Sequence, residues 1–451
     1  MPLGNCCAPA ERMRYHINMT MHSFKTAGVI VCATVLLLIF SAETEAVPIF
    51  SRKYKTSCST CHTVFPKLNP FGDAFRRNGY QIPRVDERYV KEKPVSLGAP
   101  GWKETWPEGI WPGEIPGAIP LSLSGSLLYR YDTDSRVEHD FTFPNEIEIF
   151  SAGTLGEDIS FFSSIALIED GNDFGGVERV FLRFDNLFDY SLPMHLVSLT
   201  VGQFEPSVTP FSNQRRLTHT PYLSNTFEVG KNNFHFSDQR GIEIDGVVKS
   251  RIAYALGVVN GNGTGKMDTS SGSLDNNSTK DVYLKVGYKF GGLGLDGSGV
   301  EMEEGRGLPE IGLERSIAVS ALGYYGENRI AGSGLDTDDQ FYRYGLALDI
   351  NYDSINLFGA IVQGKHDNPR GDFMETLATS YFSEADIILY PWLIGILRYG
   401  VADIEYENKR DEVVMGIVAL IRTNIKLTVE GALHTTGGGS DKGFIKLDFA
   451  L

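Results

Sequence analysis

The sequence predicts a mainly β fold, a transmembrane antiparallel β-barrel of about sixteen strands that follows a small α-helical module. Two observations predict the barrel. Polar and apolar residues alternate in segments of about ten residues or more, with tyrosine and phenylalanine clustered toward the segment ends. Short and long linkers also alternate between these segments, as they do in barrels whose two rims differ.

The alternation is clearest in the segment 121–132, LSLSGSLLYRYD, where leucines and tyrosines share one face and serines the other. The same period of two recurs in 281–290, 341–352, 425–434 and 444–451. A soluble antiparallel sandwich would alternate in the same way, with one face in its core. The segment lengths and the linkers favour the membrane barrel.

The linkers of the expected barrel, residues 121–451, indicate an even number of strands with both ends of the barrel segment on the periplasmic side. Tight connections are expected near 154–158, 190–195, 249–251, 352–354, 391–393 and 423–424, and longer polar loops near 170–177, 206–238, 261–279, 329–338 and 366–373. The longest loop is a candidate constriction or gate. The region 291–315 fits poorly, because its acidic run would lie in a short turn. The count of sixteen strands could therefore be about two strands too high or too low.

The composition argues against nucleic-acid binding. Asp and Glu total 57 against 41 Lys and Arg, which gives a net charge of −16, whereas a nucleic-acid-binding domain is expected to carry a basic patch. The acidic excess either only keeps the chain soluble or attracts cations to the lumen or vestibule of the barrel. The total charge does not separate these two roles.

Residues 1–46 are expected to be a cleaved signal peptide. The apolar run 26–42 follows Lys25, and it is too short and too close to the N-terminus for a spanning helix. A retained membrane anchor is the alternative. Cleavage would remove three of the five cysteines and leave only Cys58 and Cys61.

Cys58, Cys61 and His62 form the pattern C-x-x-C-H, the attachment sequence for covalent c-type haem. The two cysteines tether the porphyrin, and the adjacent imidazole then lies on the proximal side of the iron. A zinc site would need further N or S ligands at suitable spacing, and a redox dithiol would begin a helix in a βαβ pattern. Neither context is present, so we expect one haem c, with His62 as an axial ligand of the haem iron.

The haem module is expected to span residues 47–93 and to contain one short helix. Asn69 suits the N-cap, Pro70 the first helical position and Gly79 the C-terminal stop. Between them Phe71 and Phe75 share one face, which we expect to pack against the porphyrin. Residues 94–120 are rich in proline and tryptophan and are expected to form an extended strap without a regular helix.

The sequence does not settle the sixth ligand of the haem iron. Met194 and His195 lie in an expected periplasmic turn, near the entry of the haem module, and His219 lies in the long loop. These three residues are the weak candidates. An open or water-bound position is the alternative.

With a haem attachment sequence in front of a barrel, the chain resembles the fused monohaem cytochrome–porins of the bacterial outer membrane, the family of outer-membrane iron-oxidising cytochromes. Residues 47–83 carry the resemblance, through C-x-x-C-H followed by Phe71-Gly72 and Gly79-Tyr80. The barrel resembles the family only in architecture.

The resemblance implies electron transport across the outer membrane, with the haem module on the periplasmic side or inside the lumen. An extracellular donor or acceptor, Fe(II) among them, would be one partner and a periplasmic c-type cytochrome the other, and Fe(II) oxidase activity is implied. Because the apolar belt of such a barrel is only about 25 Å tall, one haem in the lumen suffices to pass electrons between the two sides. The direction of electron flow stays open. The alternatives are a diffusion porin with a haem-bearing plug or sensor, and a soluble periplasmic cytochrome with a β-sandwich.

Overall fold

The computed structural model describes residues 49–83, 85–97, 100–107, 114–117, 119–188, 190–263, 273–299, 313–330, 336–436 and 439–451. The expected signal peptide, residues 1–46, lies outside this part of the chain. Among the described residues no helix is long and apolar enough to span a membrane.

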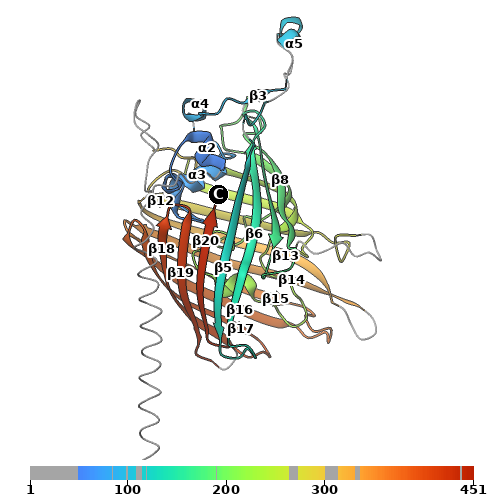
Figure 1. The fold of residues 1–451 in the computed structure, drawn as a ribbon. Coiled ribbons are helices and arrows are strands. Elements are labelled where there is room, and N and C mark those ends of the chain that lie inside the picture. Colours follow the sequence, from blue (N-terminus) through green and yellow to red (C-terminus); the bar gives the residue numbers. More distant parts are fainter. Residues whose placement is uncertain are drawn as a thin grey trace, which may run out of the picture. The chain divides into compact units, whose positions relative to one another are not determined.

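Sixteen antiparallel strands close into a barrel (Figure 1), as the sequence predicts. In chain order they are β5 (Leu121–Asp132), β6 (His139–Thr154), β7 (Ile159–Ile168), β8 (Gly176–Phe184), β9 (Ser198–Phe204), β10 (Gln239–Val248), β11 (Ile252–Val259), β12 (Asp281–Gly291), β13 (Arg315–Ile330), β14 (Thr337–Tyr352), β15 (Ile355–His366), β16 (Thr376–Tyr390), β17 (Leu393–Ile404), β18 (Arg410–Arg422), β19 (Ile425–His434) and β20 (Lys442–Ala450). Each strand pairs with its sequence neighbours. The pairing of β20 with β5 closes the barrel, with Ala450 opposite Ser124.

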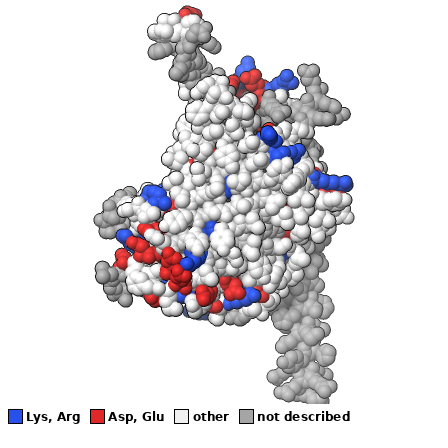
Figure 2. Space-filling model, turned by 180° about the vertical axis from the view of Figure 1, so that it is seen from behind, with Lys and Arg blue, Asp and Glu red and all other residues white. Residues whose placement is uncertain are grey.

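The two faces of the strands differ as the period of two predicts. In β19, Lys426, Thr428 and Glu430 point inward and are buried, whereas Val429 and Leu433 are 46% and 41% exposed on the outside. Figure 2 shows an outer flank with few charged side chains and a gathering of acidic ones at one end. A continuous apolar exterior of this size requires an apolar surrounding such as lipid.

The two rims of the barrel also differ. We call the rim where β5 begins and β20 ends the near rim, and the opposite one the far rim. Two-residue connections at 353–354, 391–392 and 423–424 join strands at the near rim, where tight turns were expected. The connection expected near 190–195 is longer and spans 185–197. The region 292–314 joins β12 to β13 at the near rim and adds no strand to the barrel, while its acidic run lies outside the described residues.

The N-terminal module, residues 49–90, lies at the near rim (Figure 1). It consists of α2 (Ile49–Tyr54), the 3-10 turn η1 (Cys58–Thr60), the short pair β1 (His62–Val64) and β2 (Lys67–Leu68), α3 (Pro70–Arg77) and α4 (Asp86–Tyr89). Asn69 caps α3 by accepting the N–H of Gly72 at 2.8 Å, and Gly79 follows the helix with a φ of +63°. The predicted helix and its caps are confirmed. Its apolar face packs against Tyr54 and Ile82.

The strap differs from the expected extended chain. Residues Pro100–Thr105 form a short helix, α5, and β3 (Val95–Ser96) pairs with β4 (Glu114–Ile115). The exclusion of a regular helix is therefore wrong over six residues. Pro100 begins α5, where the missing N–H of proline would have no intrahelical partner in any case.

The long loop between β9 and β10 folds into the lumen, as expected for a constriction. Its short helix α6 (Leu223–Thr226) packs against β15, β16 and β17. Arg343 of β14 donates to the carbonyl oxygens of Phe227 and Phe234 at 3.2 and 3.0 Å. The loop phenylalanines join wall tyrosines in one buried cluster. Loop side chains therefore occupy the lumen that an open pore would leave to water.

Candidate functional site

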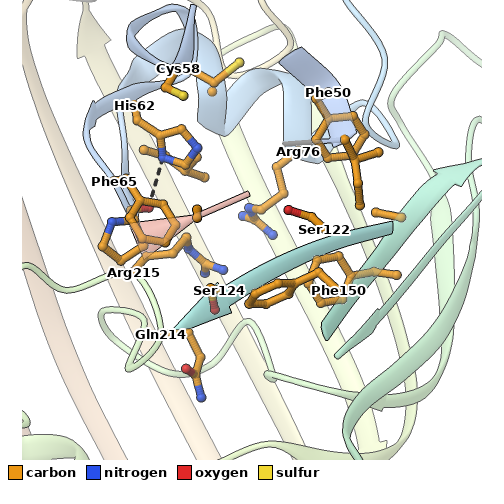
Figure 3. A pocket seen from close by; sticks show the side chains of 18 of the residues that line it. Phe50, Cys58, His62, Phe65, Arg76, Ser122, Ser124, Phe150, Gln214 and Arg215 are labelled. Carbon is orange, nitrogen blue, oxygen red and sulfur yellow. Dashed lines mark hydrogen bonds between the residues drawn. The ribbon is translucent and has the colours of Figure 1, made fainter. Parts of the chain in front are cut away.

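A cavity of about 480 Å³ lies between the N-terminal module, the barrel wall and the first part of the long loop. Figure 3 shows Cys58 and His62 on the module side of this cavity and Arg215 of the loop extending toward it. The volume falls within the range of about 300–1,000 Å³ that is usual for ligand and cofactor sites. We call it the mouth cavity.

All three residues of the C-x-x-C-H motif line the mouth cavity. Ser57 caps η1, and the N–H of Cys61 donates to the carbonyl oxygen of Cys58 at 3.2 Å. Helix α3 packs so closely on this turn that a Cβ on Gly72 would lie 2.0 Å from the carbonyl oxygen of Cys61. The glycine is needed for this close approach, because any side chain there would push the helix off the motif.

The two cysteine side chains are free and half-buried. Burial raises the pKa of Cys58, and burial together with the nearby Cys58 raises the pKa of Cys61 to about 12. Reactive redox dithiols have a lowered pKa instead, because the thiolate is the attacking species. The surroundings therefore do not resemble those of a catalytic dithiol.

The ring of His62 is oriented by a backbone carbonyl. Its Nδ1 lies 3.2 Å from the carbonyl oxygen of Pro66, and because a carbonyl can only accept, Nδ1 carries the proton. Burial lowers the pKa of His62 to about 4, so the imidazole is neutral and Nε2 keeps a free lone pair. Metal-ligating histidines are commonly held in this way, with the second ring nitrogen donating to a carbonyl.

The rest of the lining fits a covalently attached haem. Phe50, Phe75 and Phe150 line the cavity and would supply an aromatic wall for a porphyrin; Figure 3 labels Phe50 and Phe150. Arg76 Nε is buried and has no hydrogen-bond partner among the described residues, although its Nη2 donates to Asp73 at 3.1 Å. A buried donor without a partner is costly, and a haem propionate is an anion that would satisfy it.

The two loop arginines play different parts. Arg215 extends toward the cavity (Figure 3) and donates to Glu205 at 3.0 Å. Arg216 instead donates to carbonyl oxygens of its own loop, at Asn213 and His219. Both arginines line the mouth cavity, and Arg216 Nε is buried without a hydrogen-bond partner among the described residues, so the expectation that they lie near haem propionates stays a prediction for both.

Of the three candidates for a sixth ligand, the structure brings only His219 to the motif. His219 lines the mouth cavity together with His62. Met194 is 60% exposed in the connection 185–197, and neither Met194 nor His195 lines the cavity. The two residues lie in the connection between β8 and β9, and their role as iron ligands stays a prediction.

Several contacts that hold the site were not predicted. Lys67 of the module reaches Asp386 of β16 at 2.5 Å and Asn356 of β15 at 2.6 Å. Glu430 of β19 accepts the N–H groups of His219 and Thr220 at 2.6 and 2.9 Å. The pattern of the sequence shows only that these wall residues point inward. It holds no signal for their partners.

No protein-family model matches the sequence, and no curated protein matches it. Solved barrel structures are similar. The outer membrane channel DcaP of Acinetobacter baumannii is 10% identical, with a TM-score of 0.51 over 79% of this chain and 100% of that one. OmpF of Salmonella typhi, in complex with daunomycin, is 10% identical, with a TM-score of 0.50 over 75% and 98%. These likenesses show the barrel fold.

Proposed function

We propose that the chain is a bacterial outer-membrane protein that passes electrons between an extracellular donor or acceptor and a periplasmic c-type cytochrome, through one covalent haem c. The observation that carries the proposal is the placement of Cys58, Cys61 and His62 on one cavity, with Nδ1 of His62 beside a carbonyl oxygen, which leaves the Nε2 lone pair for a metal. The near rim is then the periplasmic rim.

The chain's own residues divide the work of the site. Cys58 and Cys61 tether the haem through thioether bonds, and His62 binds the iron through Nε2. When bound, the haem supplies an iron redox couple that accepts and donates single electrons. The aromatic lining excludes water and holds the ring, while Arg76 and Arg215 offer positive charge to the propionates.

The outer membrane is favoured by the exterior of the barrel. Outward side chains such as Leu346, Leu397 and Ile417 are 57%, 54% and 53% exposed, which would be costly in water over so large a surface. The similar DcaP structure is described as an outer membrane channel. The barrel would carry the haem module into the membrane and insulate it.

Fe(II) is the external donor that the family resemblance favours, and Fe(II) oxidation would be the activity. The acidic side chains gathered at one end of the barrel (Figure 2) would raise the local concentration of a cation. Figure 1 places the N-terminal module at the opposite end. A cationic donor would therefore be attracted to the far rim.

The proposal is tested with purified protein. Haem staining after denaturing electrophoresis should be positive for the natural chain and negative for Cys58→Ala with Cys61→Ala, while the barrel still shows a heat-dependent shift in migration. In liposomes, stopped-flow absorbance should show haem reduction by Fe(II) or another external donor. Absence of covalent haem from the natural chain, expressed with the haem-attachment machinery, would refute the proposal.

A diffusion porin with a haem-bearing plug is the second candidate, because the similar DcaP structure is that of a channel. The long loop fills part of the lumen and the N-terminal module lies at its near rim, which favours the electron conduit. Planar-bilayer recordings separate the two. A conduit should show almost no ion conductance, and a porin should show stable open channels.

A further inference from the structure

The loop between β9 and β10 brings one histidine to the haem-attachment motif. Among the described residues that line the mouth cavity, His219 is the only histidine besides His62, and no methionine lines it. His219 comes from a loop more than 150 residues further along the chain, and the module and the loop adjoin the same cavity (Figure 3). A second iron ligand would therefore come from the barrel domain.

The backbone of His219 is held firmly to the barrel wall. Its N–H donates to Glu430 Oε2 at 2.6 Å, and both the N–H and the hydroxyl of Thr220 donate to Oε1 of the same carboxylate. Arg398 Nη2 donates to the carbonyl oxygen of Thr220 at 2.9 Å. Hydrogen bonds to a charged group are stronger than neutral ones, so this part of the loop has a defined position.

The ring of His219 has no competing partner. Its centroid lies 4.5 Å from that of Phe444, at an interplanar angle of 59°, and no hydrogen bond joins either ring nitrogen to another described residue. Two lysines of the cavity wall are engaged in ion pairs. Lys446 pairs with Asp448 at 3.1 Å, and Lys426 pairs with Asp448 at 3.3 Å. Besides His62, His219 is thus the described lining imidazole whose lone pair is available to a metal.

From these contacts we infer that His219 is the sixth ligand of the haem iron, and that the long loop completes a bis-histidine site begun by His62. The inference rests on the proposed function, because it requires the haem. It assigns the loop a second role besides filling the lumen. Displacement of the loop would change the coordination of the iron and, with it, the reduction potential.

The test uses the full-length holoprotein, purified in detergent with covalent haem. Electron paramagnetic resonance and optical spectra of the oxidised natural chain should show low-spin iron. His219→Ala should lose the low-spin signal and gain a high-spin one, and added imidazole should restore the low-spin state. The matched control is His235→Ala, since His235 belongs to the same loop, is 42% exposed in its side chain and does not line the cavity. Its spectra should be unchanged.

A second variant covers the case in which the alanine variant fails to fold. His219→Met should keep low-spin iron and raise the reduction potential, because a thioether ligand raises it relative to imidazole. High-spin iron in the natural chain, or unchanged spectra in both His219 variants, would overturn the assignment of His219. The proposal of a covalent haem would still stand. Absence of covalent haem from the natural chain would overturn the proposed function and this inference together.

Discussion

The contact between Lys67 and Asp386 is expected to hold the N-terminal module in the barrel mouth. Lys67 Nζ lies 2.5 Å from Asp386 Oδ2, with the side chains 21% and 5% exposed. Lys67→Met would leave the carboxylate buried without its cation. Removing one partner of a buried ion pair costs about 3–5 kcal/mol, and the partial exposure of Lys67 points to the lower end, about 3 kcal/mol. At about 1.4 kcal/mol for each tenfold change, the undocked population would rise by about 10²-fold.

Native-state proteolysis measures that population, because cleavage follows the open fraction when closing is fast. Thermolysin should cut the module of the Lys67→Met variant about 10²-fold faster. Lys55→Met is the control, since Lys55 is an exposed lysine of the same module, and its rate should match that of the natural chain. Adding Asp386→Asn to Lys67→Met should restore most of the protection, because no buried charge is then left unpaired. Equal rates for the natural chain and Lys67→Met would refute the reasoning.

Four further outcomes are expected. Cys61→Ala should weaken or abolish haem staining without loss of the folded barrel, which heat-dependent migration checks. Val429→Arg, on the outer face, should destabilise the barrel by about 2–4 kcal/mol if it lies at the bilayer midplane, as measured by urea unfolding in lipid vesicles. Arg215→Gln and Arg216→Gln should each lower the haem potential in a spectroelectrochemical titration, because nearby positive charge favours the reduced haem. Deleting residues 212–224 should open an ion conductance in planar bilayers, and unchanged conductance would show that this segment does not close the lumen.

Much of the fold follows from local pattern. The period of two in β5 and β19 places alternate side chains on opposite faces, and the spacing of the turns limits the number of strands. The helix α3 was predicted because Asn69, Pro70 and Gly79 act within one or two turns of the chain. The haem motif is local as well, since Cys58, Cys61 and His62 lie within five consecutive residues. Signals of this kind need no knowledge of the rest of the molecule.

Only the tertiary structure decided which distant residues meet. Lys67 and Asp386 are 319 positions apart, and their contact depends on how the module docks and on the strand register around the whole barrel. That His219 lines the mouth cavity, and Met194 and His195 do not, depends on how the long loop folds into the lumen. The sequence by itself determined the barrel, the module helix and the motif, because short-range geometry sets them. The lining of the mouth cavity comes from barrel closure and loop packing, which join residues that carry no local sign of their partners.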